Sequence, residues 1–454
     1  MPSSGCSNEK HERAWPSLSP IFPGSHRHEP TAVPAEIQVV TTSLSKSSRY
    51  VVLFAAFVGL LFDGFELGLM PVASLSVSQS LLGDAFTPTL GGDWFARFTA
   101  ALMLGAAVGG IFLGSLGDRI GRTRALGVSI LSYSVFAGLG AFAKTQEQML
   151  VLRFLVGLGV GGVWPNAVAL AAECWPDKSR PIIAGLMGAA LNGGILMLSQ
   201  IARTWHITPE SWRWIFQLAG APAVLGLLVL TVIPESPLWL RARGARRKPG
   251  SNALRELLQP PLLRLTLIGI VIGSIPMIGA WAASKWMIPW ADKVGGASAP
   301  GYKAITQGWW ALGAVLGSFF GAQIAAWLGR RLAYSIISAA ATGLTSLMFL
   351  GTAPLQASFL PIVFAQGFVA TLFFGWLPLY LPELFPTRVR AAGSGIAYNV
   401  GRFATALGVM AAGALFAAMG GSYPKVGATG GLIYLSGIIV IWWAPDTTDK
   451  KLDA

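Results

Sequence analysis

The sequence has few of the side chains that form disulfides, metal sites or catalytic centres. Only two of its 454 residues are cysteines, Cys6 and Cys174, and only four are histidines, three of them near the N-terminus. This scarcity predicts neither a structural disulfide nor a metal site. The G-x-S-x-G and H-E-x-x-H patterns are also absent, so no motif of this kind indicates an enzyme, and no bound cofactor is expected.

Charged residues are scarce too, at 12% of the chain, whereas 53% of the residues are hydrophobic. This composition lies outside the range of soluble globular proteins and indicates that most of the chain is in contact with lipid. Runs of about 20 apolar residues, long enough to cross a bilayer, recur along the chain after residue 49. We expect an all-α membrane protein with twelve transmembrane helices, at residues 50–72, 95–117, 125–143, 148–172, 182–203, 213–233, 262–290, 304–328, 332–352, 358–381, 391–417 and 427–444.

The basic residues are distributed unevenly between the loops. Most of the 33 lysines and arginines fall in the termini and in the loops that join even-numbered spans to the next odd-numbered span. The positive-inside rule then places both termini in the cytoplasm of a multi-pass protein of the inner (plasma) membrane. The net charge of +13 follows from this topology and does not indicate nucleic-acid binding. The polar, proline-containing residues 1–48 lack signal-peptide features and are predicted to be a disordered cytoplasmic tail.

Two stretches of the chain occur twice. The pattern E-x-x-P-x-x-x-R runs from Glu173 to Arg180 and again from Glu383 to Arg390. A second set recurs without a gap, in which Gly105, Gly109, Gly121 and Arg122 match Gly313, Gly317, Gly329 and Arg330. Many transporters form a central site between parallel repeats of this kind. We therefore expect six-helix bundles at 49–233 and 262–445, a basic cytoplasmic linker at 234–261 and a cytoplasmic tail at 446–454.

The loop after the second span resembles a family signature. Its residues, Gly114-Ser-Leu-Gly-Asp118-Arg119-Ile-Gly121-Arg122, are similar to the loop between helices two and three of the major facilitator superfamily. Glycines there let helices approach closely, and the acid and arginines can form charge-assisted hydrogen bonds between helix ends. The resemblance extends over residues 50–445. It implies two pseudo-symmetric six-helix bundles and a loop that latches the outward-facing state.

The second half carries a reduced copy of this loop, with Ala326 where Asp118 would stand, so the latch is expected to be lopsided. Acids and arginines at the ends of the fourth and tenth spans and the starts of the following spans are predicted to pair with the signature residues as gates: Glu173, Arg180, Glu383 and Arg390. Single surface ion pairs contribute only about 0–1 kcal/mol, which suits a latch that must open.

Shorter segments narrow the resemblance within the superfamily. Asp63-Gly-Phe-Glu66 resembles the D-G-F-D element of sialate and aromatic-acid proton symporters, with glutamate in place of the usual second aspartate. Pro234-Glu-Ser-Pro-Leu-Trp239 resembles the end of the sixth helix in sugar porters and organic-ion transporters. The segment that begins at Asn399 and ends at Arg402 looks like the acid-transporting branches, in which an arginine at this position binds or selects the substrate.

Ionisable residues within apolar spans predict a coupling site, because burying a charge in a bilayer is costly. Asp63 and Glu66 lie on one face of the first span, and at about 1.5 Å rise per residue Glu66 reaches the depth of Arg153 in the fourth span. We expect Glu66 to carry the coupled proton and to hold Arg153 when deprotonated. A static ion pair is the alternative. Asp63 is a second candidate for titration or for substrate binding, or simply a polar residue that faces water.

Arg402 is expected near the membrane midplane, where its guanidinium could bind a carboxylate or phosphate in bidentate geometry. Asn192 is its counterpart in the first half, and Asn399 precedes it by less than one helical turn. These three are the predicted polar substrate-binding residues. The alternative for Arg402 is a structural side chain whose donors are satisfied by helix carbonyls.

Aromatic side chains offer further candidates. Trp164, Phe374 and Trp376 are expected at mid-depth, where they could form walls for a flat or ring-bearing solute, although lipid-facing packing is as good an interpretation. Lys285 is placed near the outer end of the seventh span, where it could extend to the headgroups. The neighbouring tryptophans are then interpreted as an interface belt: Trp281, Trp286 and Trp290.

Together these features predict a monomeric secondary transporter that works by alternating access and couples protons to a small organic anion. A proton-coupled sugar or polyol symporter is the alternative that the sixth-helix segment favours, and a uniporter or exporter is also open. A transporter-like solute receptor is the alternative from another class, although the tails are too short for a folded signalling domain.

Overall fold

The computed structural model describes residues 44–175, 180–244, 253–386 and 389–448, and within these ranges the regular structure is helical. Twelve helical segments of the described part are long and apolar enough to cross a membrane. This number and the all-α class agree with the sequence-based prediction. Residues 1–43, which make up most of the predicted tail, lie outside the described residues, as does the middle of the predicted linker.

Most spans are single helices, but the sixth, seventh and twelfth are each built from two helices. The bounds of the first six spans are α1 Lys46–Leu82, α2 Pro88–Ile120, α3 Arg122–Leu139, α4 Gln146–Cys174, α5 Arg180–Thr204, and α6 Arg213–Gly220 with α7 Ala223–Val232. The short helices α8 Pro237–Gly244 and α9 Ala253–Leu257 follow in the predicted linker. The last six spans are α10 Leu262–Ile278 with α11 Met287–Gly295, α12 Tyr302–Leu328, α13 Arg330–Leu350, α14 Phe359–Leu384, α15 Arg390–Ala418, and α16 Tyr423–Gly431 with α17 Ile433–Val440.

Local sequence explains where several spans begin. Thr87 accepts a hydrogen bond from the Leu90 amide at the start of α2, and Pro88 occupies the first helical turn, where its missing N–H costs nothing. Thr145 caps α4 in the same way through the Gln148 amide. These polar caps end the short loops that join one span to the next.

The internal repeat has a structural counterpart in two helix pairs. A methyl group on Gly105 of α2 would lie 2.1 Å from the Phe154 carbonyl of α4, and one on Gly313 of α12 would lie 2.2 Å from the Phe364 carbonyl of α14. Only glycine allows such close backbone approach. The two halves therefore use the same packing between their second and fourth spans.

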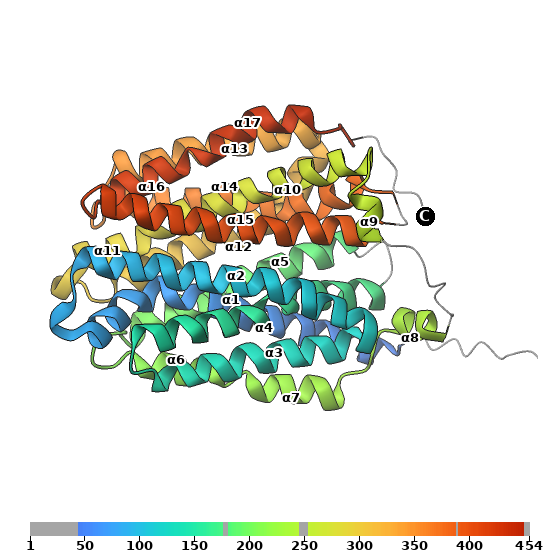
Figure 1. Cartoon of the computed structure of the whole chain (residues 1–454), viewed down its shortest axis with the longest axis horizontal. Helices are drawn as coiled ribbons and strands as arrows, with labels where there is room; N and C mark the ends of the chain where they lie inside the picture. The colour runs from blue at the N-terminus through green and yellow to red at the C-terminus, as the bar shows by residue number, and fades with distance from the viewer. Residues whose placement is uncertain (1–43, 176–179, 245–252, 387–388, 449–454) are drawn as a thin grey trace, which may run out of the picture. The chain divides into compact units, whose positions relative to one another are not determined.

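The helices of the membrane-spanning part are arranged around a central interface. Figure 1 shows α3, α6 and α7 along one side and α13, α16 and α17 along the other. Between them, α2 packs against α15 and α5 packs against α12. These two contacts join the halves and flank the cavity described below. We call the end of the bundle with Gly121 and Gly329 the signature end, and the end with Asp84 and Lys303 the far end.

Two spans differ from the predicted ones. The first helix ends at Leu82, ten residues beyond the predicted 72, because Ser74, Ser76 and Ser78 are buried in the protein and do not mark a loop. The seventh span is not one regular helix. A π-helical turn, Gly279–Ala283, and a 3₁₀ turn, Ser284–Trp286, separate α10 from α11, and such interruptions are frequent at functional sites.

Candidate functional site

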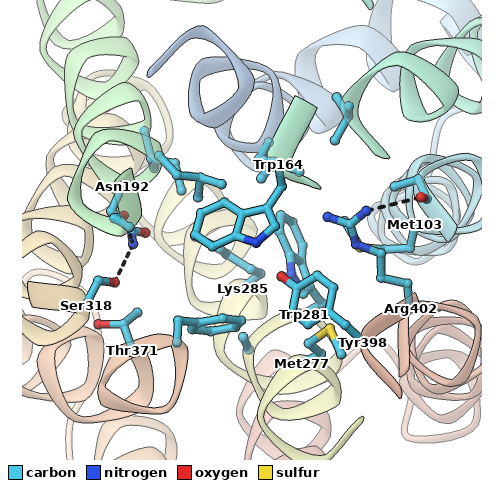
Figure 2. A pocket seen from close by; sticks show the side chains of 18 of the residues that line it. Met103, Trp164, Asn192, Met277, Trp281, Lys285, Ser318, Thr371, Tyr398 and Arg402 are labelled. Atoms are coloured by element: carbon cyan, nitrogen blue, oxygen red, sulfur yellow. Dashed lines mark hydrogen bonds between the residues drawn. The ribbon is translucent and has the colours of Figure 1, made fainter. Parts of the chain in front are cut away.

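A cavity of about 80 Å³ lies between the two halves, several times the space that one water molecule needs. Its lining includes residues of α1, α2, α4 and α5 from the first half and of α10, α12, α14 and α15 from the second. Figure 2 shows Arg402 on one side of the cavity and Asn192 on the other, with Trp164 between them. Arg402 and Asn192, two of the predicted polar binding residues, therefore both line this cavity, on opposite sides.

Arg402 of α15 is nearly buried, with 9% of its surface exposed. Its Nη1 donates to the Ala106 carbonyl of α2 at 3.1 Å, and its guanidinium carbon lies 5.1 Å from the centre of the Tyr398 ring. One helix carbonyl occupies only part of a group with five N–H donors. The other donors are available to an anion in the cavity.

The opposite wall is neutral and polar. Asn192 of α5 donates through Nδ2 to Ser318 Oγ of α12 at 2.8 Å, a bond that joins the two halves. Thr371 of α14 also lines the cavity. Its hydroxyl contacts the Gly367 carbonyl of the same helix at 2.8 Å and the Ala314 carbonyl of α12 at 3.0 Å. The cavity therefore has a cationic side and an amide side, as the sequence predicts for Arg402 and Asn192.

The structure separates the other predicted binding residues into two groups. Trp164 and Phe374 line the cavity, and their role in binding stays a prediction. Trp376 does not line the cavity. It follows Phe374 by two residues on α14, and side chains two apart on a helix point about 200° apart. It is fully buried, stacks on Tyr380 at 4.4 Å between ring centres and donates to the Arg330 carbonyl at 3.0 Å, so the structure does not place Trp376 in the cavity as predicted.

Asn399 is also corrected. Its Nδ2 donates to the Gly395 carbonyl of the same helix at 3.0 Å. A methyl group on Gly110 of α2 would lie 2.2 Å from its Oδ1. Asn399 therefore fills the close contact between α2 and α15 and is absent from the cavity lining.

The largest correction concerns Lys285. Its side chain does not extend to the headgroups but lines the cavity with 1% of its surface exposed. The span continues to Gly295, about 15 Å further at 1.5 Å per residue, which places Lys285 deep in the bundle. The belt interpretation of its neighbours is also wrong, since Trp281 lines the cavity and Trp286 and Trp290 are packed inside the protein.

The predicted contact between the first and fourth spans is present. Arg153 Nη1 lies 3.3 Å from Glu66 Oε2, and the two side chains are 0% and 1% exposed. Glu66 Oε1 and two further nitrogens of Arg153 have no hydrogen-bond partner among the described residues. The Arg153 guanidinium also packs on Phe216 at 5.3 Å. The pair is thus buried and only partly satisfied by the described residues, which makes its protonation state important for its energy.

Asp63 is buried next to this pair. It is 1% exposed, and neither carboxylate oxygen has a hydrogen-bond partner among the described residues. It interacts electrostatically with Arg402 and with Glu66. Asp63 therefore lies within electrostatic reach of both the cavity arginine and the Glu66–Arg153 pair, a relation that linear sequence does not show.

Residues 52–409 match the family described as Major Facilitator Superfamily. The chain belongs to this superfamily. It is 30% identical to the cis,cis-muconate transport protein of Acinetobacter baylyi, over 81% of this chain and 87% of that one. It is 32% identical to a probable 4-methylmuconolactone transporter of Cupriavidus pinatubonensis, over 70% and 73%.

Solved structures support the same fold. A crystal structure of a D-xylose-proton symporter superposes with a TM-score of 0.69 at 17% identity, covering 89% of this chain and 99% of that one. At this identity the likeness shows the fold alone. The family match, the transporter relatives and the twelve apolar helices of the described part show that the protein is a multi-pass membrane transporter of the major facilitator superfamily.

The superfamily's signature loop forms a hydrogen-bonded network at one end of the first half. Arg122 binds Asp118 at 2.6 Å and Glu173 at 3.2 Å. Gly121, with φ of 113°, occupies a conformation that favours glycine. The remaining predicted gate residues there are placed as follows: Gly114 faces Pro165, and Arg119 is exposed.

The segment after the sixth span completes this network. The Thr123 amide donates to Glu235 Oε1 at 3.1 Å, and Ser236 donates to Glu173. Trp239 donates to the Asp118 carbonyl at 3.0 Å. The resemblance of this segment to sugar porters thus corresponds to a structural role within the first half.

The second half repeats the network with substitutions. Arg330 forms two bonds to Glu383, at 2.9 and 3.0 Å, and Thr447 donates to Glu383 at 2.6 Å, as Ser236 does to Glu173. The Ala325 carbonyl, at 3.0 Å, takes the place of Asp118 as acceptor for the arginine. Hydrogen bonds from Thr448 lower the pKa of Asp446, so this residue is ionised at neutral pH.

The two copies of the signature loop differ in one acceptor. Arg122 bonds to the Asp118 carboxylate in the first half, whereas Arg330 bonds to the Ala325 carbonyl in the second. Glu173 and Glu383 each pair with the arginine of their own half. Arg390 is the first residue of α15, and the side chain of Arg180 lies outside the described residues. Their gating roles stay predictions.

The far end contains a polar contact that the sequence analysis missed. Lys303 Nζ of α12 donates to Asp292 at 3.0 Å, to Ser76 Oγ of α1 at 3.1 Å and to the Ile207 carbonyl at 3.0 Å. All three donors of a buried ammonium are used, and two of them bind the first half. Lys303 therefore holds the two halves together at the far end.

Lys303→Met is expected to open the far end more often, since charge-assisted bonds contribute about 1.5–3 kcal/mol each. The measurement uses Ile195→Cys, a cavity-lining position, in a background without Cys6 and Cys174. Two of the Lys303 bonds reach the first half, about 3 kcal/mol or more together, so labelling by an impermeant maleimide from the far-end side is expected to become about a hundredfold faster with Lys303→Met. The exposed Lys293→Met serves as the control, and equal rates in both variants would contradict the assignment.

Proposed function

We propose that this protein is a proton-coupled symporter that imports a small organic anion of the carboxylate type by alternating access. The observation that carries the proposal is the position of Arg402, a nearly buried guanidinium in the lining of a cavity between the two halves. Relatives named for muconate and methylmuconolactone support an organic acid as the substrate class. In this proposal the far end faces the cell exterior and the signature end faces the cytoplasm, with both termini.

Proton coupling is assigned to the first span. Glu66 carries the proton, and Arg153 is its partner when it is deprotonated; Asp63 is the second candidate carrier. The energetic basis is the burial of the pair, because a buried ion pair that loses one charge leaves an uncompensated partner and favours another packing of the helices. Asp63 lies within electrostatic reach of Arg402, so an anion bound at the arginine would change the electrostatic environment of the carboxylates.

The proposal is tested by uptake into proteoliposomes with an acidic exterior. The panel pairs sialate, benzoate, nicotinate and lactate with neutral xylose and nicotinamide, so that nicotinate and nicotinamide differ only in charge at one group. Accumulation of acids that a protonophore abolishes is expected. Uptake confined to the neutral solutes would contradict both the anion site and the role of Arg402.

A further inference from the structure

The lining of the central cavity has two cations. Its described residues include Arg402 and Lys285 but no carboxylate. Lys285 is 1% exposed, and its Nζ has no hydrogen-bond partner among the described residues. Lys303 is buried to a similar degree but uses all three donors within the protein. The comparison indicates that the N–H donors of Lys285 are available to a ligand that enters the cavity.

The position of the Lys285 ammonium is fixed by an aromatic ring. Nζ lies 3.4 Å from the centre of the Trp310 ring and 5.7 Å from that of Trp281. Trp310 is oriented by a bond from its Nε1 to Gln366 Oε1 at 2.7 Å, and Gln366 donates to Ser284 Oγ at 2.6 Å. Ser284 precedes Lys285 in the 3₁₀ turn of the interrupted span. The broken helix therefore positions both the ammonium and, through Gln366, the ring beneath it.

This arrangement is suited to an anionic ligand. A ring face attracts a cation and offsets part of the cost of removing it from water, but it accepts none of the three N–H bonds in the usual way. A buried charge without a partner is costly, and a carboxylate would relieve that cost. Arg402 and Lys285 belong to different spans of the same half and line one cavity, so one carboxylate is assigned to each.

We propose that Lys285 is a second anion-recognition residue, and that the preferred substrates are small dicarboxylates held between Arg402 and Lys285. The inference rests on the proposed function and names the substrate class within it. Trp164, Trp281 and Phe374 also line the cavity, and these aromatic walls favour a flat, unsaturated connection between the two carboxylates.

The test compares two acids with the same carbon skeleton. trans,trans-Muconate and sorbate share a six-carbon diene and carry two carboxylates and one, respectively. Equilibrium binding of each to the purified full-length protein is measured by calorimetry, which requires no transport or proton coupling. The wild type is expected to bind muconate at least about tenfold more tightly than sorbate, because one additional charge-assisted hydrogen bond contributes about 1.5–3 kcal/mol.

Variants assign this preference to the lysine. Lys285→Met, similar in length but neutral, is expected to remove most of the preference by weakening muconate binding while sorbate binding changes less than about threefold. Lys285→Arg is expected to keep the preference, and Lys293→Met, outside the cavity, is expected to match the wild type. A folded Lys285→Arg also shows that the position tolerates replacement if the methionine variant proves unstable.

The outcomes distinguish the inference from the proposed function. Equal binding of both acids by the wild type, or equal weakening of both by Lys285→Met, would overturn the dicarboxylate inference and leave the organic-anion function standing. Failure of the wild type to bind either acid, together with uptake of neutral solutes only, would overturn both.

Discussion

Arg402→Ala is expected to weaken binding of a transported carboxylate about a hundredfold or more, because it removes the fork of donors that faces the cavity. Truncating one side of a buried, charge-assisted contact costs about 2–5 kcal/mol. Arg402→Lys keeps the charge but not the bidentate geometry, so an intermediate loss is expected. Binding is measured by calorimetry on the purified variants, and uptake is measured in proteoliposomes.

The control must account for the structural contacts of Arg402, since it also bonds to Ala106 across the α2–α15 interface. Thermal stability of each variant is therefore measured without ligand. Arg97→Ala is the matched control: Arg97 is 44% exposed and pairs with Asp93 on the surface of α2, where a pair contributes little. Wild-type affinity in a folded Arg402→Ala would show that the arginine is satisfied by helix carbonyls and does not bind substrate.

Glu66→Gln is expected to separate acid binding from proton movement. Glutamine has nearly the same shape but cannot carry a proton, so acid should still bind while substrate-driven proton uptake is lost. The substitution also leaves the Arg153 charge without its partner, which costs about 3–5 kcal/mol in a buried pair. The double variant Glu66→Gln/Arg153→Met removes both charges and is expected to recover stability without recovering coupling.

Two comparisons make this result specific. Glu147→Gln, in the exposed first turn of α4, is expected to transport and couple like the wild type. Asp63→Asn tests the second candidate. If Asp63→Asn loses proton coupling and Glu66→Gln retains it, Asp63 and not Glu66 carries the proton. Intact coupling in Glu66→Gln and Asp63→Asn alike would leave the Glu66–Arg153 contact as a static ion pair.

The features that could be predicted from the sequence are those that depend on regular helices. Apolar length determined the number of spans, and the repeated glycines of α2 and α12 predicted that these two spans are equivalent. The depth of Glu66 and Arg153 could be counted at about 1.5 Å per residue because α1 and α4 are each continuous to those positions. Pairing also requires that the two helices be neighbours. The structure packs α1 against α4 and places Arg153 Nη1 3.3 Å from Glu66 Oε2.

The features that could not be predicted depend on irregular backbone or on which way a side chain points. The π turn at Gly279–Ala283 changes the register of the seventh span, and with it the position of Lys285, without an obvious signal in composition. The direction of Trp376 could have been inferred from Phe374, because two residues of one helix only two apart rarely share a face. Lys303 lies just outside the predicted span 304–328, and its partners Ser76 and Ile207 come from distant segments of the chain, so no local pattern marked it.

Substrate-driven proton movement in proteoliposomes tests the central claim most directly. A membrane-permeant weak acid also carries protons unaided, so the substrate used is a dicarboxylate that is doubly ionised at pH 7, and protein-free liposomes serve as the control. An external pH indicator is expected to report alkalinisation when the acid is added to proteoliposomes and no change in the control. Uptake of the acid without any movement of protons would contradict the account.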